Sequence, residues 1–204
     1  MLMYQTYSSR TTPDGASQAQ LWLARNFPHQ FRIVTPVYRL PHVADGTHLT
    51  NVGTKWMGTY FARALVDILL NREPVNFIMP GIPVIENSTT IRIPHKSGFP
   101  LQFLGNTPDG GYVLTNETDG SNIPITNREV RANGDVVLTA TLPADSVITV
   151  TYARVNKDPA MLPINGGTGD LCDTDTTEVV IDGVARSLRT WCPSYRQVAM
   201  TADI

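Results

Sequence analysis

The sequence predicts a chain of mixed class, in which a partial parallel α/β layer over residues 1–78 is followed by a β-sandwich over residues 79–204. Strand-like and helix-like segments alternate through about the first 75 residues, which is the pattern of parallel βαβ units. From about Pro80 onward, Pro, Gly, Asn and Thr become common and short alternating runs replace the helical ones. The 204 residues, 42% of them hydrophobic, can bury one large core or two small ones, which argues against disorder.

The N-terminal region is expected to contain four elements in the order strand, helix, strand, helix, formed by residues 1–6, 16–27, 31–37 and 50–70. Both helical segments repeat their apolar residues every three or four positions. Pro28 ends the first helix, and Thr50 caps the second. Parallel sheets usually hold more than two strands, so the first strand lacks a neighbour within this sequence. We therefore expect the missing strands to come from another chain or from a segment that was removed.

The β-rich region is expected to hold short strands over residues 89–94, 101–104, 112–116, 123–126, 135–140 and 146–154. Turn-forming residues separate these segments. Asn133-Gly134 predicts a two-residue hairpin, and Asp182-Gly183 predicts a second hairpin in the C-terminal tail. Short strands at this spacing are typical of a β-sandwich.

Composition and charge exclude several classes of function. The formal net charge of −2 predicts no broad attraction to nucleic acid or anionic membranes. No apolar run approaches the roughly 20 residues that span a bilayer, so no membrane insertion is expected. The N-terminus lacks the basic region and cleavage site of a signal peptide. No metal site or cofactor is expected.

The two cysteines, Cys172 and Cys192, are too few for a disulfide scaffold or a four-thiolate zinc site. We expect buried thiols. The alternatives are a disulfide between the two cysteines and a role for them as metal ligands.

Asp45 and His48 are the main candidates for chemistry. They lie three residues apart on the loop between the second strand and the second helix, at the carboxyl edge of the parallel strands where α/β proteins bind ligands. A histidine can act as a general base near neutral pH, and a carboxylate bound to its second ring nitrogen fixes the tautomer. Gly46 and Thr47 between them allow both side chains to face one way. The alternative is an ordinary Asp-Gly turn followed by a surface histidine.

The segment Asp45-Gly-Thr-His48-Leu-Thr50, followed by Gly53 and an aliphatic and aromatic helix, resembles the last conserved block of the SGNH (GDSL-type) hydrolases. The carbohydrate O-acetylesterases, including the sialate O-acetylesterase-like proteins of phages and prophages, are the most similar group. This resemblance covers about residues 1–72 and implies a flavodoxin-like layer, with Asp45 and His48 in a Ser-His-Asp triad. Looser resemblance to the β-rich region of such phage proteins lies in residues 169–173 and 188–192.

The sequence departs from that family at the nucleophile. The Gly-Asp-Ser segment of the family is absent, and Asp119-Gly-Ser121 has the wrong order and follows no βα unit. Ser8 and Ser9 follow the first strand, but no glycine turn surrounds them. The Gly and Asn blocks that supply the family's oxyanion donors are also missing. The resemblance therefore implies that an upstream half of the hydrolase supplies the serine, either as a partner chain or as a segment that was removed. It also implies that this chain is inactive alone. The remaining alternative is that the Asp45–His48 region keeps the structure of the family without its catalytic role.

Three further residues are candidates for contact with substrate. Tyr4 and Gln5 end the first strand, and His42 lies on the same loop as Asp45; ordinary packing and a solvated loop position are the alternatives. His29 is expected to be exposed, and His95 has no evident metal partner.

The resemblance also implies a substrate and a location for the protein. The expected substrate is an acetylated surface polysaccharide, and the expected location is the virion, in a phage tail or fibre, or the extracellular space. We expect a homo-oligomer. The alternative function is a non-catalytic virion tail or fibre protein with a structural or glycan-binding role.

Overall fold

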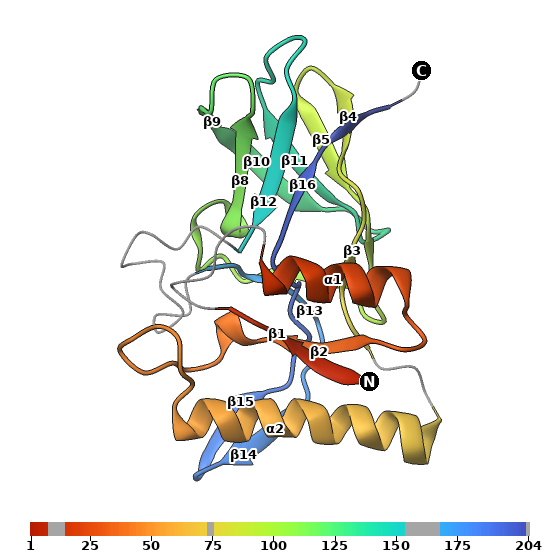
Figure 1. The fold of residues 1–204 in the computed structure, drawn as a ribbon, viewed down its shortest axis with the longest axis vertical. Coiled ribbons are helices and arrows are strands. Elements are labelled where there is room, and N and C mark those ends of the chain that lie inside the picture. Colours follow the sequence, from red (N-terminus) through yellow and green to blue (C-terminus); the bar gives the residue numbers. More distant parts are fainter. Residues whose placement is uncertain (8–14, 73–75, 154–167, 203–204) are drawn as a thin grey trace.

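The N-terminal strands and helices cover one end of a larger β-rich body in the computed structural model, which describes residues 1–7, 15–72, 76–153 and 168–202 (Figure 1). Strands predominate in the described ranges, where they form several small sheets, and the same ranges contain two α-helices. Neither helix, within those ranges, is long and apolar enough to cross a membrane.

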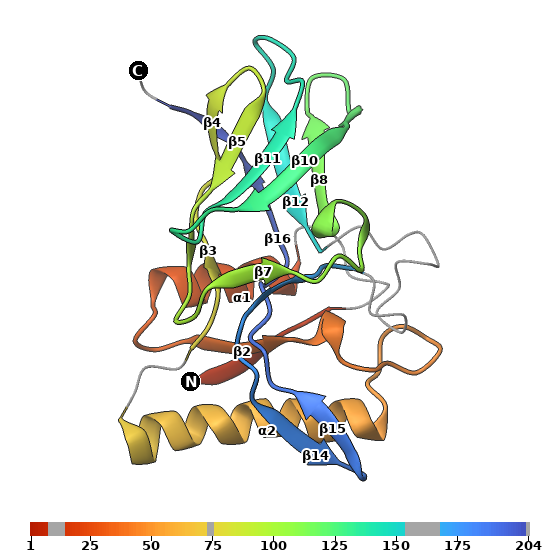
Figure 2. The same cartoon turned by 180° about the vertical axis from the view of Figure 1, so that it is seen from behind.

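The N-terminal elements follow the predicted order. They are β1 (Leu2–Gln5), α1 (Ala16–Asn26), β2 (Arg32–Pro36) and α2 (Asn51–Val66), which continues as one π-helical turn, η2 (Asp67–Asn71). β1 and β2 are parallel, with Leu2 opposite Arg32. α1 lies on one face of this pair and α2 on the other (Figures 1 and 2). The two helices therefore bury both faces of a very small parallel sheet.

The prediction of a flavodoxin-like α/β layer was wrong. Within the described residues, β1 pairs only with β2, so the parallel sheet has two strands. The next contacts of β2 come from later in the chain: the guanidinium of Arg32 lies 5.6 Å from the centre of the Phe77 ring. Helical and strand periodicity identifies elements but not how many strands join one sheet, and here the β-rich region supplies the packing that further parallel strands would supply.

The β-rich region contains two larger sheets that face each other (Figures 1 and 2). The five-stranded sheet has the order β10 (Ile125–Val130), β11 (Val136–Ala140), β5 (Thr90–Ile93), β4 (Val84–Asn87) and β17 (Met200–Thr201). The four-stranded sheet has the order β16 (Tyr195–Val198), β12 (Ile148–Tyr152), β8 (Tyr112–Asn116) and β9 (Asn122–Ile123). Their inner side chains belong to one hydrophobic core that also includes residues of β2 and α1. This arrangement is compatible with the expected sandwich.

Three further strand pairs lie outside the two larger sheets. They are β3 (Met79–Pro80) with β6 (His95–Lys96), β7 (Leu101–Phe103) with β13 (Leu171–Asp173), and β14 (Glu178–Ile181) with β15 (Val184–Ser187). The last pair is the hairpin predicted at Asp182-Gly183, whose two turn residues have φ of +50° and +79°. The Asn133-Gly134 hairpin also forms, but its loop spans residues 131–135 rather than two residues.

Buried tyrosines join the N-terminal elements to the β-rich region. Tyr38 lies in η1 (Val37–Arg39), the short 3-10 helix that follows β2, and has no exposed surface. Its hydroxyl donates to the Cys192 carbonyl at 2.7 Å and lies 3.1 Å from the hydroxyl of Tyr152. The Tyr152 oxygen in turn accepts from the Leu171 N–H at 3.0 Å. These bonds satisfy polar groups that would be costly to bury unpaired.

Gln5 makes a second buried connection. Its amide nitrogen donates to the carbonyls of Ser17 and Ser194, at 3.0 and 2.8 Å. Its oxygen accepts from the Ser194 N–H at 2.7 Å and from the Ser194 hydroxyl at 3.2 Å. All four hydrogen-bonding positions of this amide are used, so β1, α1 and the start of β16 are held together at one point. We call the Tyr38, Tyr152, Gln5 and Ser194 contacts the buried junction.

His95 is buried beside this junction. Its Nδ1 lies 2.9 Å from the Ile93 carbonyl oxygen, and its Nε2 lies 3.8 Å from the sulfur of Cys192. Burial lowers the pKa of His95 to about 4, although the Ile93 carbonyl and Asp135 oppose this shift. The imidazole is therefore neutral at neutral pH.

Tyr38→Phe should lower the free energy of unfolding by about 1–3 kcal/mol, because it removes the hydroxyl that satisfies the buried Cys192 carbonyl. Equilibrium urea unfolding measures the change. Tyr4→Phe, on an exposed side chain, is the control and should leave the free energy within about 0.5 kcal/mol of the wild-type value. Equal stability of the two variants would contradict the importance of the buried junction.

Acid should destabilise the protein partly through His95. Because its folded-state pKa, about 4, lies below the ordinary value, the unfolded chain binds the proton more tightly. Stability is therefore lost as the pH falls from about 6.5 to 4, by up to about 3 kcal/mol from this group. His95→Gln should flatten the dependence of the unfolding free energy on pH in this range, whereas His29→Gln, an exposed control, should not. Identical slopes for the wild type and His95→Gln would contradict the assignment.

Candidate functional site

The loop between β2 and α2, residues 40–50, carries the predicted Asp45 and His48. His42 and Leu49 form an antiparallel bridge, and the Val43 N–H donates to the His48 carbonyl at 2.8 Å. These contacts close the loop into a hairpin with Asp45 near its tip. Gly46 has a φ of +63°, a left-handed conformation that suits glycine.

The N-terminus of α2 fixes the other end of this loop. The Thr50 hydroxyl accepts from the Gly53 N–H at 3.1 Å, which confirms the predicted cap. The Thr50 N–H also donates to the Pro41 carbonyl at 2.9 Å. A side chain at Gly53 would lie 2.4 Å from that same carbonyl oxygen, so the close approach of loop and helix requires glycine here.

Asp45 and His48 form a direct pair. The Nδ1 of His48 lies 2.6 Å from Oδ2 of Asp45. The other carboxylate oxygen accepts from the main-chain N–H groups of Thr47 and His48, at 2.8 and 3.0 Å. The His48 N–H, then the His48 imidazole, then the Thr47 N–H hold the pKa of Asp45 well below its usual range. The carboxylate is therefore charged at neutral pH and orients the ring, so the proton of neutral His48 lies on Nδ1 and Nε2 is left as an acceptor.

The free side of the imidazole faces outward. The side chain of His48 is 78% exposed, and that of Asp45 is 38% exposed. His48 Nε2 has no hydrogen-bond partner among the described residues. The pair thus has the base and the orienting carboxylate of a hydrolase triad, and within the described ranges no serine hydroxyl is bonded to the base.

The possible serine nucleophiles do not complete the pair. The Ser121 hydroxyl donates to Asp119 at 2.7 Å, in the turn between β8 and β9. Ser8 and Ser9 lie outside the described residues.

The three predicted substrate contacts lie in different environments. Tyr4 is 38% exposed on β1, whereas Gln5 is fully engaged in the buried junction and has no donor left for a ligand. His42 is buried at the base of the Asp45 loop, with Nδ1 2.7 Å from the Leu40 carbonyl oxygen. Burial lowers the pKa of His42, so its ring is neutral. His42 and the Asp45–His48 pair therefore lie on one loop, whereas the side chain of Gln5 is hydrogen-bonded inside the core.

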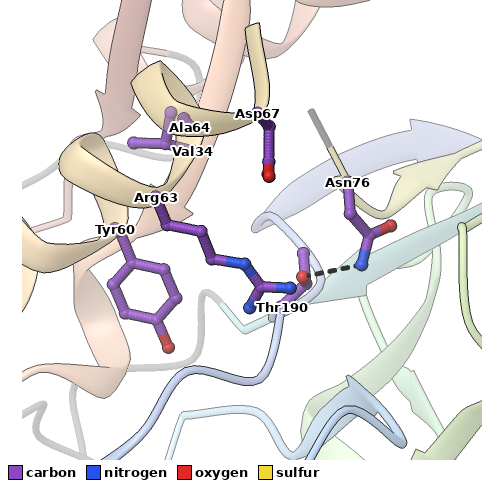
Figure 3. A pocket seen from close by; sticks show the side chains of 7 residues that line it. All are labelled: Val34, Tyr60, Arg63, Ala64, Asp67, Asn76 and Thr190. Atoms are coloured by element: carbon purple, nitrogen blue, oxygen red, sulfur yellow. Dashed lines mark hydrogen bonds between the residues drawn. The ribbon is translucent and has the colours of Figure 1, made fainter. Parts of the chain in front are cut away.

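A small cavity lies between α2 and the segments around Asn76 and Thr190 (Figure 3). Its volume is about 10 Å³, which is room for about one water molecule. The amide of Asn76 donates to the Thr190 hydroxyl at 3.1 Å, and Arg63 forms an ion pair with Asp175 at 2.6 Å. These groups join α2 to the β-rich region, and the cavity is too small for a sugar.

Cys172 and Cys192 are free and buried, as predicted. Burial raises the pKa of Cys172 to about 12 and that of Cys192 well above its ordinary value, so neither is a reactive thiolate at neutral pH. Across residues 1–7, 15–72, 76–153 and 168–202, no group of three or more His, Cys, Asp or Glu side chains is placed to hold a metal ion.

A larger cavity, of about 300 Å³, was not expected from the sequence. It is lined by residues of α1, of β3 and the residues flanking it, and of β6, among them Arg25, Phe77 and Lys96. These residues come from three distant segments and share no motif, so the sequence carries no signal for this cavity.

Comparison with known proteins gives little guidance. No protein-family model matches the chain, and no curated protein matches it. One solved structure that is similar over a portion of the chain is the N-terminal part of the bacterial S-layer protein SbsC, with a TM-score of 0.38 and 13% sequence identity. The match covers 76% of this chain and 30% of that chain.

Asp45→Ala should change the tautomer of His48. In the wild type the carboxylate accepts from Nδ1–H, so neutral His48 should be protonated on Nδ1. Without the carboxylate, that tautomer loses its partner and the Nε2-protonated form should predominate. The ¹⁵N chemical shifts of the His48 ring above pH 8 measure the tautomer, with exposed His29 as an internal control. An Nε2-protonated His48 in the wild type would contradict the pairing.

Proposed function

We propose that this chain is the C-terminal part of a phage-type carbohydrate O-acetylesterase, in which Asp45 and His48 are the acid–base half of a Ser-His-Asp triad. The supporting observation is the 2.6 Å contact between His48 Nδ1 and Asp45 Oδ2, with the opposite ring nitrogen free. This geometry does not depend on a flavodoxin-like layer, because the same triad occurs on unrelated folds.

The proposed reaction hydrolyses an acetyl ester. The serine oxygen attacks the acetyl carbonyl while His48 Nε2 takes the serine proton, and Asp45 stabilises the resulting imidazolium. Collapse of the tetrahedral intermediate breaks the bond to the sugar oxygen, which leaves with the proton from His48. Water then attacks the acetyl-serine with His48 again as base, which releases acetate and restores the serine.

The serine is proposed to come from a partner chain or an upstream segment. Support comes from β1, which pairs only with β2 within the described residues and so offers a strand edge to a further strand. Met1, which precedes this strand, and Tyr4 on it are 76% and 38% exposed. Leu65 on α2 and Ile68 in η2 are also exposed, whereas the ring N–H of Trp56 on α2 donates to the Ser187 carbonyl of β15.

The proposed substrate is an acetylated surface polysaccharide. The proposed location is a virion tail or fibre, or the extracellular space, with a homo-oligomer as the working assembly. The resemblance of Asp45-Gly-Thr-His48 and its surroundings to phage esterases supports this setting.

A non-catalytic tail or fibre protein is the second candidate. It is favoured by the exposure of His48 and by the lack, within the described residues, of a serine bonded to it. In this case the β-rich region would have a structural or glycan-binding role.

Co-expression with the coding sequence immediately upstream, followed by acetate assay on an O-acetylated polysaccharide, tests the catalytic proposal. The complex should release acetate, and His48→Ala should reduce the rate by at least about 10³-fold, because the base is lost. His29→Ala, at an exposed histidine outside the Asp45–His48 pair, should keep the rate. Full activity in His48→Ala would overturn the proposal, and glycan binding without acetate release would favour the non-catalytic role.

A further inference from the structure

The 300 Å³ cavity lies between the C-terminal end of α1, β3 with the turn after it, and β6. Figures 1 and 2 both show β3 passing this end of α1. Its walls are mainly apolar and are formed by Ala24, Pro28, Phe77, Met79, Ile82 and Pro94. This size and lining fall at the lower end of the range for small-molecule sites.

Arg25 brings a positive charge to this apolar cavity. Its Nη2 donates to the Pro80 carbonyl at 2.6 Å, and the amide oxygen of Gln197, when turned toward it, is a second acceptor. Its Nε is buried and has no hydrogen-bond partner in the part of the chain that the structure describes. No Asp or Glu among the described residues forms an ion pair with Arg25. The guanidinium is thus held by neutral oxygens alone.

The other polar residues at the cavity do not neutralise this charge. Lys96 is exposed and also has no ion pair within the described ranges. His95 has both ring nitrogens engaged inside the protein, and none of the described residues that line the cavity is acidic. The cavity therefore combines apolar walls with two cations and no counter-charge.

A half-buried cation without a counter-charge is unfavourable, since burial removes water and no carboxylate replaces it. Burial accordingly lowers the pKa of Arg25. An anion in the cavity would supply the missing charge, and a carboxylate matches the geometry of a guanidinium. An apolar group on the same ligand would cover the wall around Phe77, Met79 and Ile82.

We propose that this cavity binds a small amphipathic carboxylate, with its carboxylate toward Arg25 and Lys96 and its apolar end against Phe77 and Met79. The site is separate from the Asp45–His48 pair, because β3 and the loop between β2 and α2 lie on opposite sides of the molecule (Figure 1). The proposal therefore stands whether or not the chain takes part in ester hydrolysis.

Titration with hexanoate, followed by NMR of ¹³C-methyl methionine, tests the proposal. Hexanoate should shift the methyl signal of Met79 saturably, while the signal of Met200, which does not line the cavity, should stay in place. Hexanamide, with the same chain and no charge, should bind at least tenfold more weakly. Lys96→Glu should weaken hexanoate binding at least tenfold.

Lys55→Glu is the matched control, because it changes the net charge equally on exposed α2 and removes only a surface ion pair with Asp182. It should leave hexanoate binding within twofold of the wild type. Equal binding of hexanamide, no saturable Met79 shift, or an equal effect of Lys55→Glu and Lys96→Glu would each overturn the proposal.

Discussion

The buried junction is the constraint on which the remaining structure depends. Tyr38, at the end of β2, gives its hydroxyl proton to the Cys192 carbonyl, and Gln5, at the end of β1, is bonded on both sides of its amide to Ser194. These groups have almost no exposed surface, so a displacement that breaks their hydrogen bonds while the interface stays buried would leave several polar atoms desolvated and unpaired. The two parallel strands are thereby held against the β-rich region without the further strands that such a sheet usually has.

The position of the Asp45–His48 pair follows from that constraint. The loop begins two residues after Tyr38, is closed by the bridge between His42 and Leu49, and ends at the Thr50 cap of α2. Both ends of the loop are thus fixed, and its tip holds the carboxylate and the imidazole together through short local bonds. The free ring nitrogen points away from the core, which suits a base that acts on a group brought by another segment.

The sequence could predict those features that depend on residues close together in the chain. Helical spacing located α1 and α2, Thr50 identified the start of α2, Asp182-Gly183 identified a hairpin, and the Asp45-to-His48 spacing indicated that the two side chains could meet. The catalytic role of that pair and the domain boundary at residue 78 stay predictions. The fold class failed because the number of strands beside β1 and the packing of β2 on segments more than 40 residues away depend on long-range contacts. The cavity beside Arg25 could not be predicted from the sequence for the same reason, since α1, β3 and β6 meet only in the folded chain.

Amide hydrogen exchange followed by mass spectrometry tests the central claim, that the buried junction joins the N-terminal strands and the β-rich region into a single cooperative unit. The slowest amides of β2 and those of β12 should exchange through openings of the same free energy, and Tyr38→Phe should lower both by the same amount. Exchange of β2 through a separate opening of much lower free energy, with β12 unaffected by the substitution, would contradict the account.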